Sequence, residues 1–253
     1  MRHGARLAIV GALAPLTLTG CLGVKTTQDK SAERAARAKT RLANQKGLTI
    51  TRQNGDVKVE LSRVLQDPNG VAAIVRLKND GPAQIGVPVA ITVQDAKGTK
   101  LFANDAPGLD PALVSMPVLR QGETTYWVNN QILVAGKADK LAVKVGAAKG
   151  QAPANLPKIT IADLKLDHDQ DGAFARGTIR NDSSVEQRRL TIFCVVGAGQ
   201  NVEAAGRAVV DKLPPAAGAK KPTKFTVYFI GKPKRAELSC SAPPTVLSGG
   251  QAK

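Results

Sequence analysis

The chain has 253 residues and a formal net charge of +16 at pH 7. This length accommodates two domains of ordinary size, and 43% hydrophobic residues with only 3% aromatic ones predict a mainly aliphatic core. The two histidines, His3 and His168, are too few for a His-rich zinc site and argue against a Ser-His-Asp triad or a Cys-His pair.

The first twenty residues have the pattern of an export signal. Arg2 and Arg6 give a positively charged start, and residues 7–18 form an apolar stretch of 12 residues. That stretch is shorter than the roughly 20 residues that cross a bilayer as a helix, and Pro15 interrupts it. Residues 1–20 are therefore predicted to be a signal peptide that is cleaved.

The signal ends in the tetrad Leu18-Thr19-Gly20-Cys21. This tetrad resembles the lipobox of bacterial lipoproteins, in which the cysteine thiol is diacylated and the chain is cut just before it. The resemblance implies lipidation of Cys21, for example with palmitate, and stable attachment to the extracytoplasmic side of the cell membrane. The alternative is a plain secretory signal with a cysteine that happens to lie near the cut.

Residues 21–47 are predicted to be the lipid anchor and a basic tether. From residue 25 onward this segment has seven Lys or Arg residues against two acidic ones. Residues 29–45 are mostly good helix formers, Glu33 lies four residues before Arg37, and Gly47 provides a stop. Because Leu42 is the only large apolar side chain in residues 29–45, this predicted helix lacks the hydrophobic face needed to insert into a bilayer.

From residue 48 the sequence changes to the period-two alternation of β-strands. The clearest runs are residues 57–62, 71–78 and 87–94, and a last pair covers 124–129 and 140–145. In the second run, one face has Val71, Ala73, Val75 and Leu77, and the other has Ile74, Arg76 and Lys78. Short strands separated by turns, with no helical period between them, predict an antiparallel β-sandwich over residues 48–147.

A second sandwich is predicted over residues 158–243, after a linker at 148–157 and before a flexible tail at 244–253. It repeats the first at a constant offset of 102 residues, which relates Asp67, Gly70 and Asn79 to Asp169, Gly172 and Asn181. A looser match relates Leu119, Gly122 and Trp127 to Leu213, Gly218 and Phe225.

The run Gly177–Asn181, the strand at 190–196 and the Leu-then-Gly turn before an aromatic strand resemble a known type of module. They are similar to the FxLYD-type immunoglobulin-like β-sandwiches of bacterial lipoproteins. The first half matches this pattern at residues 75–79, 95–98 and 122–127, but it has no glycine at the position that corresponds to Gly177. The resemblance covers most of residues 48–242 and implies two tandem immunoglobulin-like domains. It implies no reaction.

Cys194 and Cys240 lie in apolar strand segments and have no counterparts in the first half. If Cys21 is lipidated, these two remain as a pair in an oxidising compartment, where a disulfide is the default. Such a bond closes 46 residues of chain and contributes roughly 4 kcal/mol in the loop-entropy model. Two buried free thiols are the alternative.

The segment Asp167-His168-Asp169-Gln170-Asp171-Gly172 matches the opening of an EF-hand calcium loop. The closing position falls on Thr178 instead of a bidentate glutamate, and no helices flank the loop. Because the same turn occurs at residues 67–70, the segment is predicted to be a structural hairpin turn, with a weak calcium site at Asp167, Asp169 and Asp171 as the alternative. No other metal and no cofactor is predicted.

Trp127, the single tryptophan, is interpreted as a core residue of the first sandwich. In a strand either it or Tyr126 must face inward, and a core with few aromatic side chains needs a large one. The alternative is an exposed aromatic side chain that recognises a partner.

These features together predict a non-enzymatic binding or assembly protein of the cell envelope, with the membrane and an envelope protein as partners. The net positive charge attracts polyanions, and outside the cytoplasm these are lipid headgroups and wall polymers, not nucleic acid. A binder of such polymers through its basic surface is therefore the first alternative. A cryptic enzyme, or an accessory subunit of one, is the second.

Overall fold

The computed structural model describes residues 46–218, 221–234 and 237–247, all of which belong to one compact unit. The regular secondary structure of these residues is almost entirely β-strand in antiparallel sheets, which confirms the predicted all-β sandwich fold. Within this part of the chain, no helix has the length and apolar character needed to span a bilayer. The predicted signal peptide and the tether up to residue 45 lie outside the described residues.

The strands of the first half are β1 (Val57–Asp67), β2 (Gly70–Asn79), β3 (Gln84–Gln94), β4 (Lys100–Ala103), β5 (Ser115–Leu119), β6 (Thr124–Ile132), β7 (Lys140–Val145) and β8 (Gly150–Gln151). Those of the second half are β9 (Ile159–Asp169), β10 (Gly172–Asn181), β11 (Gln187–Val196), β12 (Ala204–Leu213), β13 (Thr223–Tyr228), β14 (Ile230–Gly231) and β15 (Leu238–Ser241). Two 3-10 turns, η1 (Pro111–Leu113) and η2 (Ala216–Gly218), lie in loops.

The first half contains two sheets. One has the order β1-β2-β6, and the other is built around β3, which pairs with β4, β5, β7 and β8 along its length. The apolar positions of β3 alternate as predicted: Val87, Val89, Ile91 and Val93 are buried, and they belong to one cluster with the buried residues of β2 and β6. Period-two alternation on a long central strand therefore produces the core of this half.

The second half also contains two sheets, β13-β10-β9 and β14-β12-β11-β15. Its core cluster includes Ile179 of β10, Ile192 of β11 and Phe225 of β13. Gly177 is needed at its position because a Cβ atom there would lie 2.9 Å from Phe225 Cζ and 3.0 Å from the Ala162 carbonyl oxygen. The first half has a valine at the matching position, and there the partner on β6 is Trp127.

The register of the strands shows the internal repeat. In the first hairpin Val57 pairs with Asn79 and Asp67 with Gly70, and 102 residues later Ile159 pairs with Asn181 and Asp169 with Gly172. Trp127 lies opposite Val75, as Phe225 lies opposite Gly177. The repeated sequence positions therefore occupy equivalent positions in the two sheets.

A buried asparagine at the end of each hairpin explains why the segment from Leu119 resembles the segment from Leu213. The Asn79 Nδ2 group donates to the carbonyl oxygens of Pro82 (2.8 Å), Leu119 (3.4 Å) and Arg120 (3.1 Å). In the second half Asn181 Nδ2 donates to Val185 O (2.8 Å) and Leu213 O (3.4 Å). Because buried carbonyl groups require partners, each asparagine fixes the turn that follows it against the start of the Leu-then-Gly segment.

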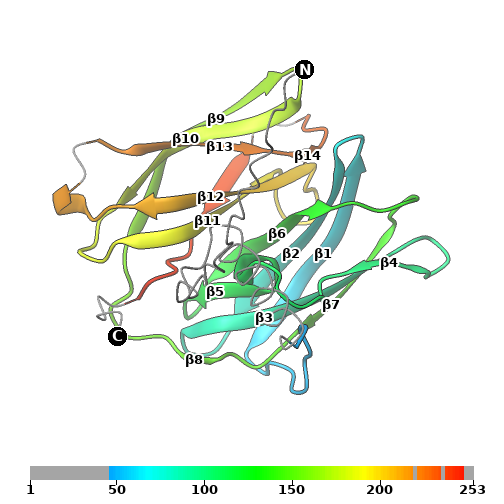
Figure 1. Ribbon diagram of the computed structural model, residues 1–253, viewed down its shortest axis with the longest axis horizontal. Helices are drawn as coiled ribbons and strands as arrows, with labels where there is room; N and C mark the ends of the chain where they lie inside the picture. Colours follow the sequence, from blue (N-terminus) through cyan, green and yellow to red (C-terminus); the bar gives the residue numbers. More distant parts are fainter. Residues whose placement is uncertain (1–45, 219–220, 235–236, 248–253) are drawn as a thin grey trace, which may run out of the picture. The chain divides into compact units, whose positions relative to one another are not determined.

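The two halves share a hydrophobic core. Phe193 and Val195 of β11 belong to the same buried cluster as Ile74 of β2 and Val128 of β6. In Figure 1, β11 and β12 lie between β13 on one side and β6 on the other, in agreement with the contacts between these strands. Ile74, which shares a face of β2 with Arg76 and Lys78, is therefore fully buried, because the second half covers that face.

Two segments that the sequence assigns to a linker and a tail make specific contacts. Gly150 and Gln151, inside the predicted linker 148–157, form β8 and pair with Ile85 and Gln84. In the predicted tail, the Thr245 and Val246 N–H groups donate to Gln187 Oε1 at 2.9 and 3.1 Å. Composition misses these contacts because they depend on backbone groups, which every residue type supplies.

Candidate functional site

The tetrad Leu18-Thr19-Gly20-Cys21 lies outside the described residues. Lipidation at Cys21 therefore stays a prediction.

The predicted pair Cys194 and Cys240 forms a disulfide, with the two Cα atoms 4.1 Å apart. The two residues are directly opposite each other on neighbouring strands β11 and β15. Cys194 is fully buried in the core of the second half, whereas Cys240 is only partly buried. The bond therefore fastens the short edge strand β15 to the centre of its sheet.

The aspartate-rich segment forms the hairpin turn that the repeat predicts. Asp169 Oδ1 accepts from the Asp171 and Gly172 N–H groups at 2.9 and 3.2 Å, and its Oδ2 accepts from the Tyr228 hydroxyl at 2.8 Å. This hydrogen bond to the carboxylate, with burial, raises the pKa of Tyr228. Asp167 forms an ion pair with Arg176 at 2.7 Å. Nowhere in the described part of the chain do three or more His, Cys, Asp or Glu residues come together as a metal-binding group.

Trp127 is fully buried, which confirms that it is a core residue. Its indole Nε1 donates to the Ala112 carbonyl oxygen of η1 at 3.0 Å. This contact fixes the loop between β4 and β5 to the core. The same loop carries Asp110, which lines a cavity between the two halves.

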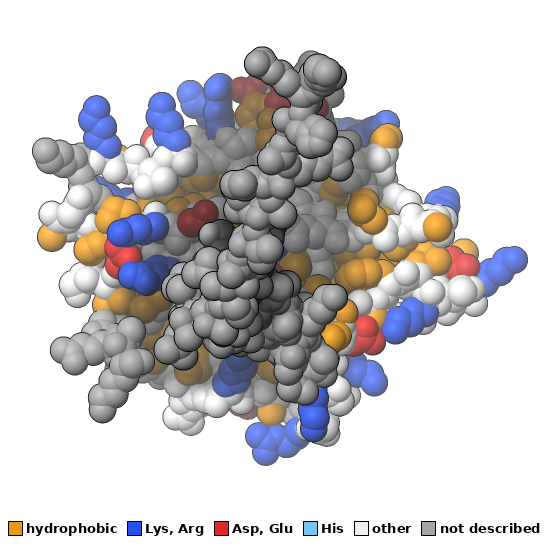
Figure 2. Space-filling view, in the orientation of Figure 1, with side chains coloured by type: hydrophobic (Ala, Val, Ile, Leu, Met, Phe, Trp, Pro, Cys, Tyr) orange, Lys and Arg blue, Asp and Glu red, His pale blue; other side chains and the backbone are white. Residues whose placement is uncertain are grey.

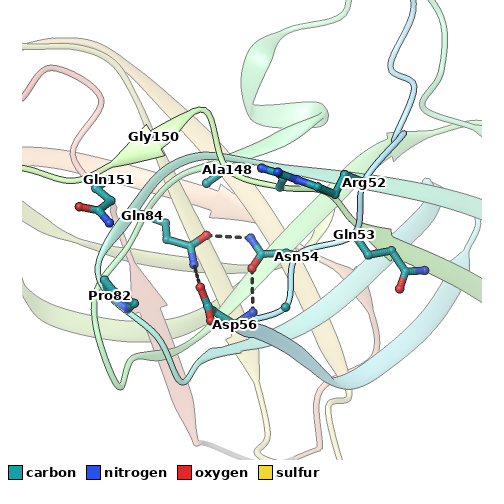
Figure 3. Close-up of a pocket in the computed structure, with 11 residues that line it drawn as sticks. Arg52, Gln53, Asn54, Asp56, Pro82, Gln84, Ala148, Gly150 and Gln151 are labelled. Atoms are coloured by element: carbon teal, nitrogen blue, oxygen red, sulfur yellow. Dashed lines mark hydrogen bonds between the residues drawn. The ribbon is translucent and has the colours of Figure 1, made fainter.

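The first cavity, the polar recess, has a volume of about 320 Å³ and is lined by residues 52–56, Pro82, Gln84, Ala147, Ala148, Gly150 and Gln151. Figure 3 shows a chain of hydrogen bonds within it: Asn54 Nδ2 donates to Gln84 Oε1 (2.7 Å) and Gln84 Nε2 to Asp56 Oδ2 (3.2 Å). The Asp56 N–H closes the chain by donating to Asn54 Oδ1 at 3.0 Å. These bonds fasten the segment before β1 to the start of β3.

Gln187 has the same structural role in the second half. Gln84 pairs with Leu119 and Gln187 with Leu213, so the two glutamines start equivalent strands. Gln84 fastens the segment that enters the first half, and Gln187 fastens the segment 245–246. We therefore interpret the polar recess as a structural fastening, because its central side chains already satisfy one another.

The second cavity, the junction pocket, lies between the two halves and has a volume of about 370 Å³. Its apolar lining comes from Ile85, Pro111, Ala112, Pro117, Pro244 and Leu247. Its polar lining includes Lys149, Arg188, Arg189, Asp110 and Thr191. This combination of apolar walls with a few convergent polar groups is typical of ligand sites.

An ion pair crosses the junction pocket. Arg189 Nη2 lies 2.5 Å from Asp110 Oδ2, and Asp110 Oδ1 also accepts from the Ala112 N–H at 2.9 Å. Burial by itself raises the pKa of Asp110, but the Ala112 N–H, Arg189 and the charge of Arg207 together outweigh it and lower the pKa. Asp110 is therefore a carboxylate at neutral pH and holds Arg189 across the junction.

Arg207 of β12 lies beside this ion pair. It is opposite Phe193, so its side chain is on the same face of the sheet as Phe193 and Thr191, the face toward the first half. Arg207 is only 8% exposed, and its Nε and Nη1 atoms are buried with no hydrogen-bond partner among the described residues. Burial lowers the pKa of Arg207. The negative charge of Asp110 acts in the opposite direction, and the positive charge of Arg189 lowers the pKa further.

Basic residues elsewhere on the visible face are dispersed. Figure 2 shows Lys and Arg side chains spread around its edge, not gathered in one patch. In the described part of the chain several basic residues are paired with acidic ones, as in the ion pairs Lys58–Asp80 (2.6 Å) and Arg180–Asp182 (2.6 Å). Exposed pairs of this kind contribute about 0–1 kcal/mol each and provide no directed attraction for a ligand.

Comparison with protein family models found no match, and comparison with curated proteins found no significant similarity. The geometry of the junction pocket is therefore the only evidence that it is a ligand site. Sequence reasoning missed this pocket, because its lining residues come from five separate stretches of the chain. The one signal available in the sequence was Arg207, a charged residue within the otherwise uncharged run 204–210.

Proposed function

We propose that this chain is an exported lipoprotein, attached to the outer side of a bacterial cell membrane through lipid on Cys21. In this proposal it is a non-enzymatic binding module of the envelope, and its two sandwiches are immunoglobulin-like modules. The tetrad at residues 18–21 supports the attachment, and the all-β fold with its internal repeat is consistent with the modules.

The observation that carries the binding role is the junction pocket. It is formed by both halves, and those halves share a core, so the pocket has a fixed shape instead of opening and closing about a flexible linker. A preorganised pocket loses little conformational freedom on binding. Its convergent polar groups include three basic side chains, which suit recognition of a ligand by charge.

Metabolic labelling with radioactive palmitate tests the attachment. We expect label in the wild-type protein and none in Cys21→Ala. The matched control is the double variant Cys194→Ala/Cys240→Ala, which keeps Cys21 and should be labelled like the wild type. Equal labelling of the wild type and Cys21→Ala would refute lipidation at this residue.

Site-specific photocrosslinking in intact cells tests the binding role. A photoreactive residue at Ser115, which lines the junction pocket, should give a discrete adduct with an envelope component. The same residue at Ser62, exposed on β1 and outside the pocket, is the control and should give none. Equal adducts from the two positions, or none from Ser115, would contradict a binding role for the pocket.

A further inference from the structure

The junction pocket has two chemically different parts. One wall is made of aliphatic and proline side chains, among them Ile85, Pro117 and Leu247. The other has the basic side chains of Lys149, Arg188 and Arg189. An apolar wall next to fixed positive charge is complementary to a molecule that has an apolar portion and an anionic group.

The positive charge around this pocket is only partly neutralised. Arg189 is paired with Asp110, and Arg188 Nε lies 3.0 Å from Glu186 Oε1. Lys149 has no ion-pair partner within the described residues. The charge of Arg207 acts on both Asp110 and Arg189, and two of its nitrogen atoms have no partner among the described residues. Because Arg207 is shielded from water, its charge acts at a lower effective dielectric constant than a surface charge would.

Two energetically unfavourable features lie close to the junction pocket. Arg189 has a positive φ of 49°, a left-handed conformation that is uncommon and costly for a residue with a long side chain. The Arg207 guanidinium is buried with two nitrogen atoms that have no hydrogen-bond partner among the described residues, an arrangement that costs stability. Strained backbone and unpartnered buried polar groups cluster at binding and active sites, so their presence in one region points to ligand binding.

We propose that the junction pocket binds a small amphipathic molecule with one anionic group, a phosphate or a carboxylate. The anionic group binds at Arg189 and Lys149, where the buried charge of Arg207 strengthens the attraction, and the apolar portion lies against Ile85, Pro117 and Leu247. This inference rests on the proposed binding role and specifies the chemical class of the ligand. Guanidinium groups suit both anions because their donors match two oxygens at once.

Isothermal titration calorimetry of the full chain carrying Cys21→Ala, purified without detergent, tests this proposal. The probes are octyl phosphate and octanoate, each below its micelle concentration, with inorganic phosphate and octanol as single-feature controls. We expect at least one of the two anionic amphiphiles to bind, and both inorganic phosphate and octanol to bind at least tenfold more weakly. Equal binding of octanol would show a purely apolar pocket, and equal binding of inorganic phosphate would show an adventitious ion only; either result overturns the proposal.

Variants locate the site. Arg189→Gln and Arg207→Gln should each weaken binding of the anionic amphiphile at least tenfold, whereas Arg176→Gln, an exposed arginine on β10 outside the pocket, should not change it. Unchanged affinity in Arg207→Gln with an intact fold would refute the contribution of the buried charge. If no anionic amphiphile binds, the proposed ligand is wrong, while the membrane attachment is decided separately by the palmitate labelling.

Discussion

Replacing Arg207 by methionine should make the ligand-free protein more stable. The guanidinium has two buried nitrogen atoms without partners, and each unsatisfied buried donor costs about 1–3 kcal/mol. Methionine keeps much of the volume of the aliphatic stem, so little packing is lost. Asp110 keeps its ion pair with Arg189 and its hydrogen bond from the Ala112 N–H. We therefore expect a gain of about 2 kcal/mol.

For proteins of this size, such a gain corresponds to a rise in melting temperature of roughly 4–8 °C. Because burial lowers the pKa of Arg207 in the folded state, the charged form is disfavoured by folding at every pH where the unfolded arginine is protonated. The advantage of methionine should thus hold throughout the pH range in which the protein is folded, because the guanidinium stays protonated there.

Urea unfolding followed by fluorescence of the buried Trp127 provides the assay, because the chain has a single tryptophan. The matched control is Arg176→Met, which removes an exposed guanidinium and should change stability by no more than about 0.5 kcal/mol. If Arg207→Met is less stable than the wild type, the guanidinium is satisfied in solution, for instance by ordered water, and the argument for a retained functional charge fails.

Three further predictions concern the disulfide, a glycine and the junction ion pair. Loss of the disulfide in Cys194→Ala/Cys240→Ala should lower stability by up to about 4 kcal/mol. Because the halves share a core, both should unfold in one urea transition. If the midpoint seen by tryptophan fluorescence, which reports the first half, is unchanged, the halves unfold separately. Gly177→Ala should cost about 1–3 kcal/mol in thermal melts through its clash with Phe225, and a neutral effect would mean that the two strands separate easily. Because the pKa of Asp110 is lowered in the folded state, its contribution to stability is present above the pKa of the unfolded carboxylate and is lost as pH falls through the pKa of the folded state. Asp110→Asn should therefore make the loss of stability in acid shallower. An unchanged dependence of stability on acid pH would contradict this.

The sequence predicted the strands that have clean alternation and missed those that do not. β3 and β7 follow from their period-two patterns, and the repeat fixed the hairpin turns at 67–70 and 169–172. β12 was missed because it begins with Ala-Ala-Gly, which gives no alternation, and because its two faces are covered unequally along its length. β5 was missed because Pro117 lies at its centre.

What the sequence determined by itself is local or repeated: the all-β class, the matched hairpins, the core position of Trp127 and the residues able to form the disulfide. Tertiary structure alone decided the packing of one half on the other. That packing buries Ile74, brings Asp110 to Arg189 and places Arg207 out of water. The physical reason is that alternation tells which side chains share a face of a strand but not what covers that face. Covering depends on contacts between residues far apart in the chain, such as Asp110 and Arg189, which are 79 positions apart.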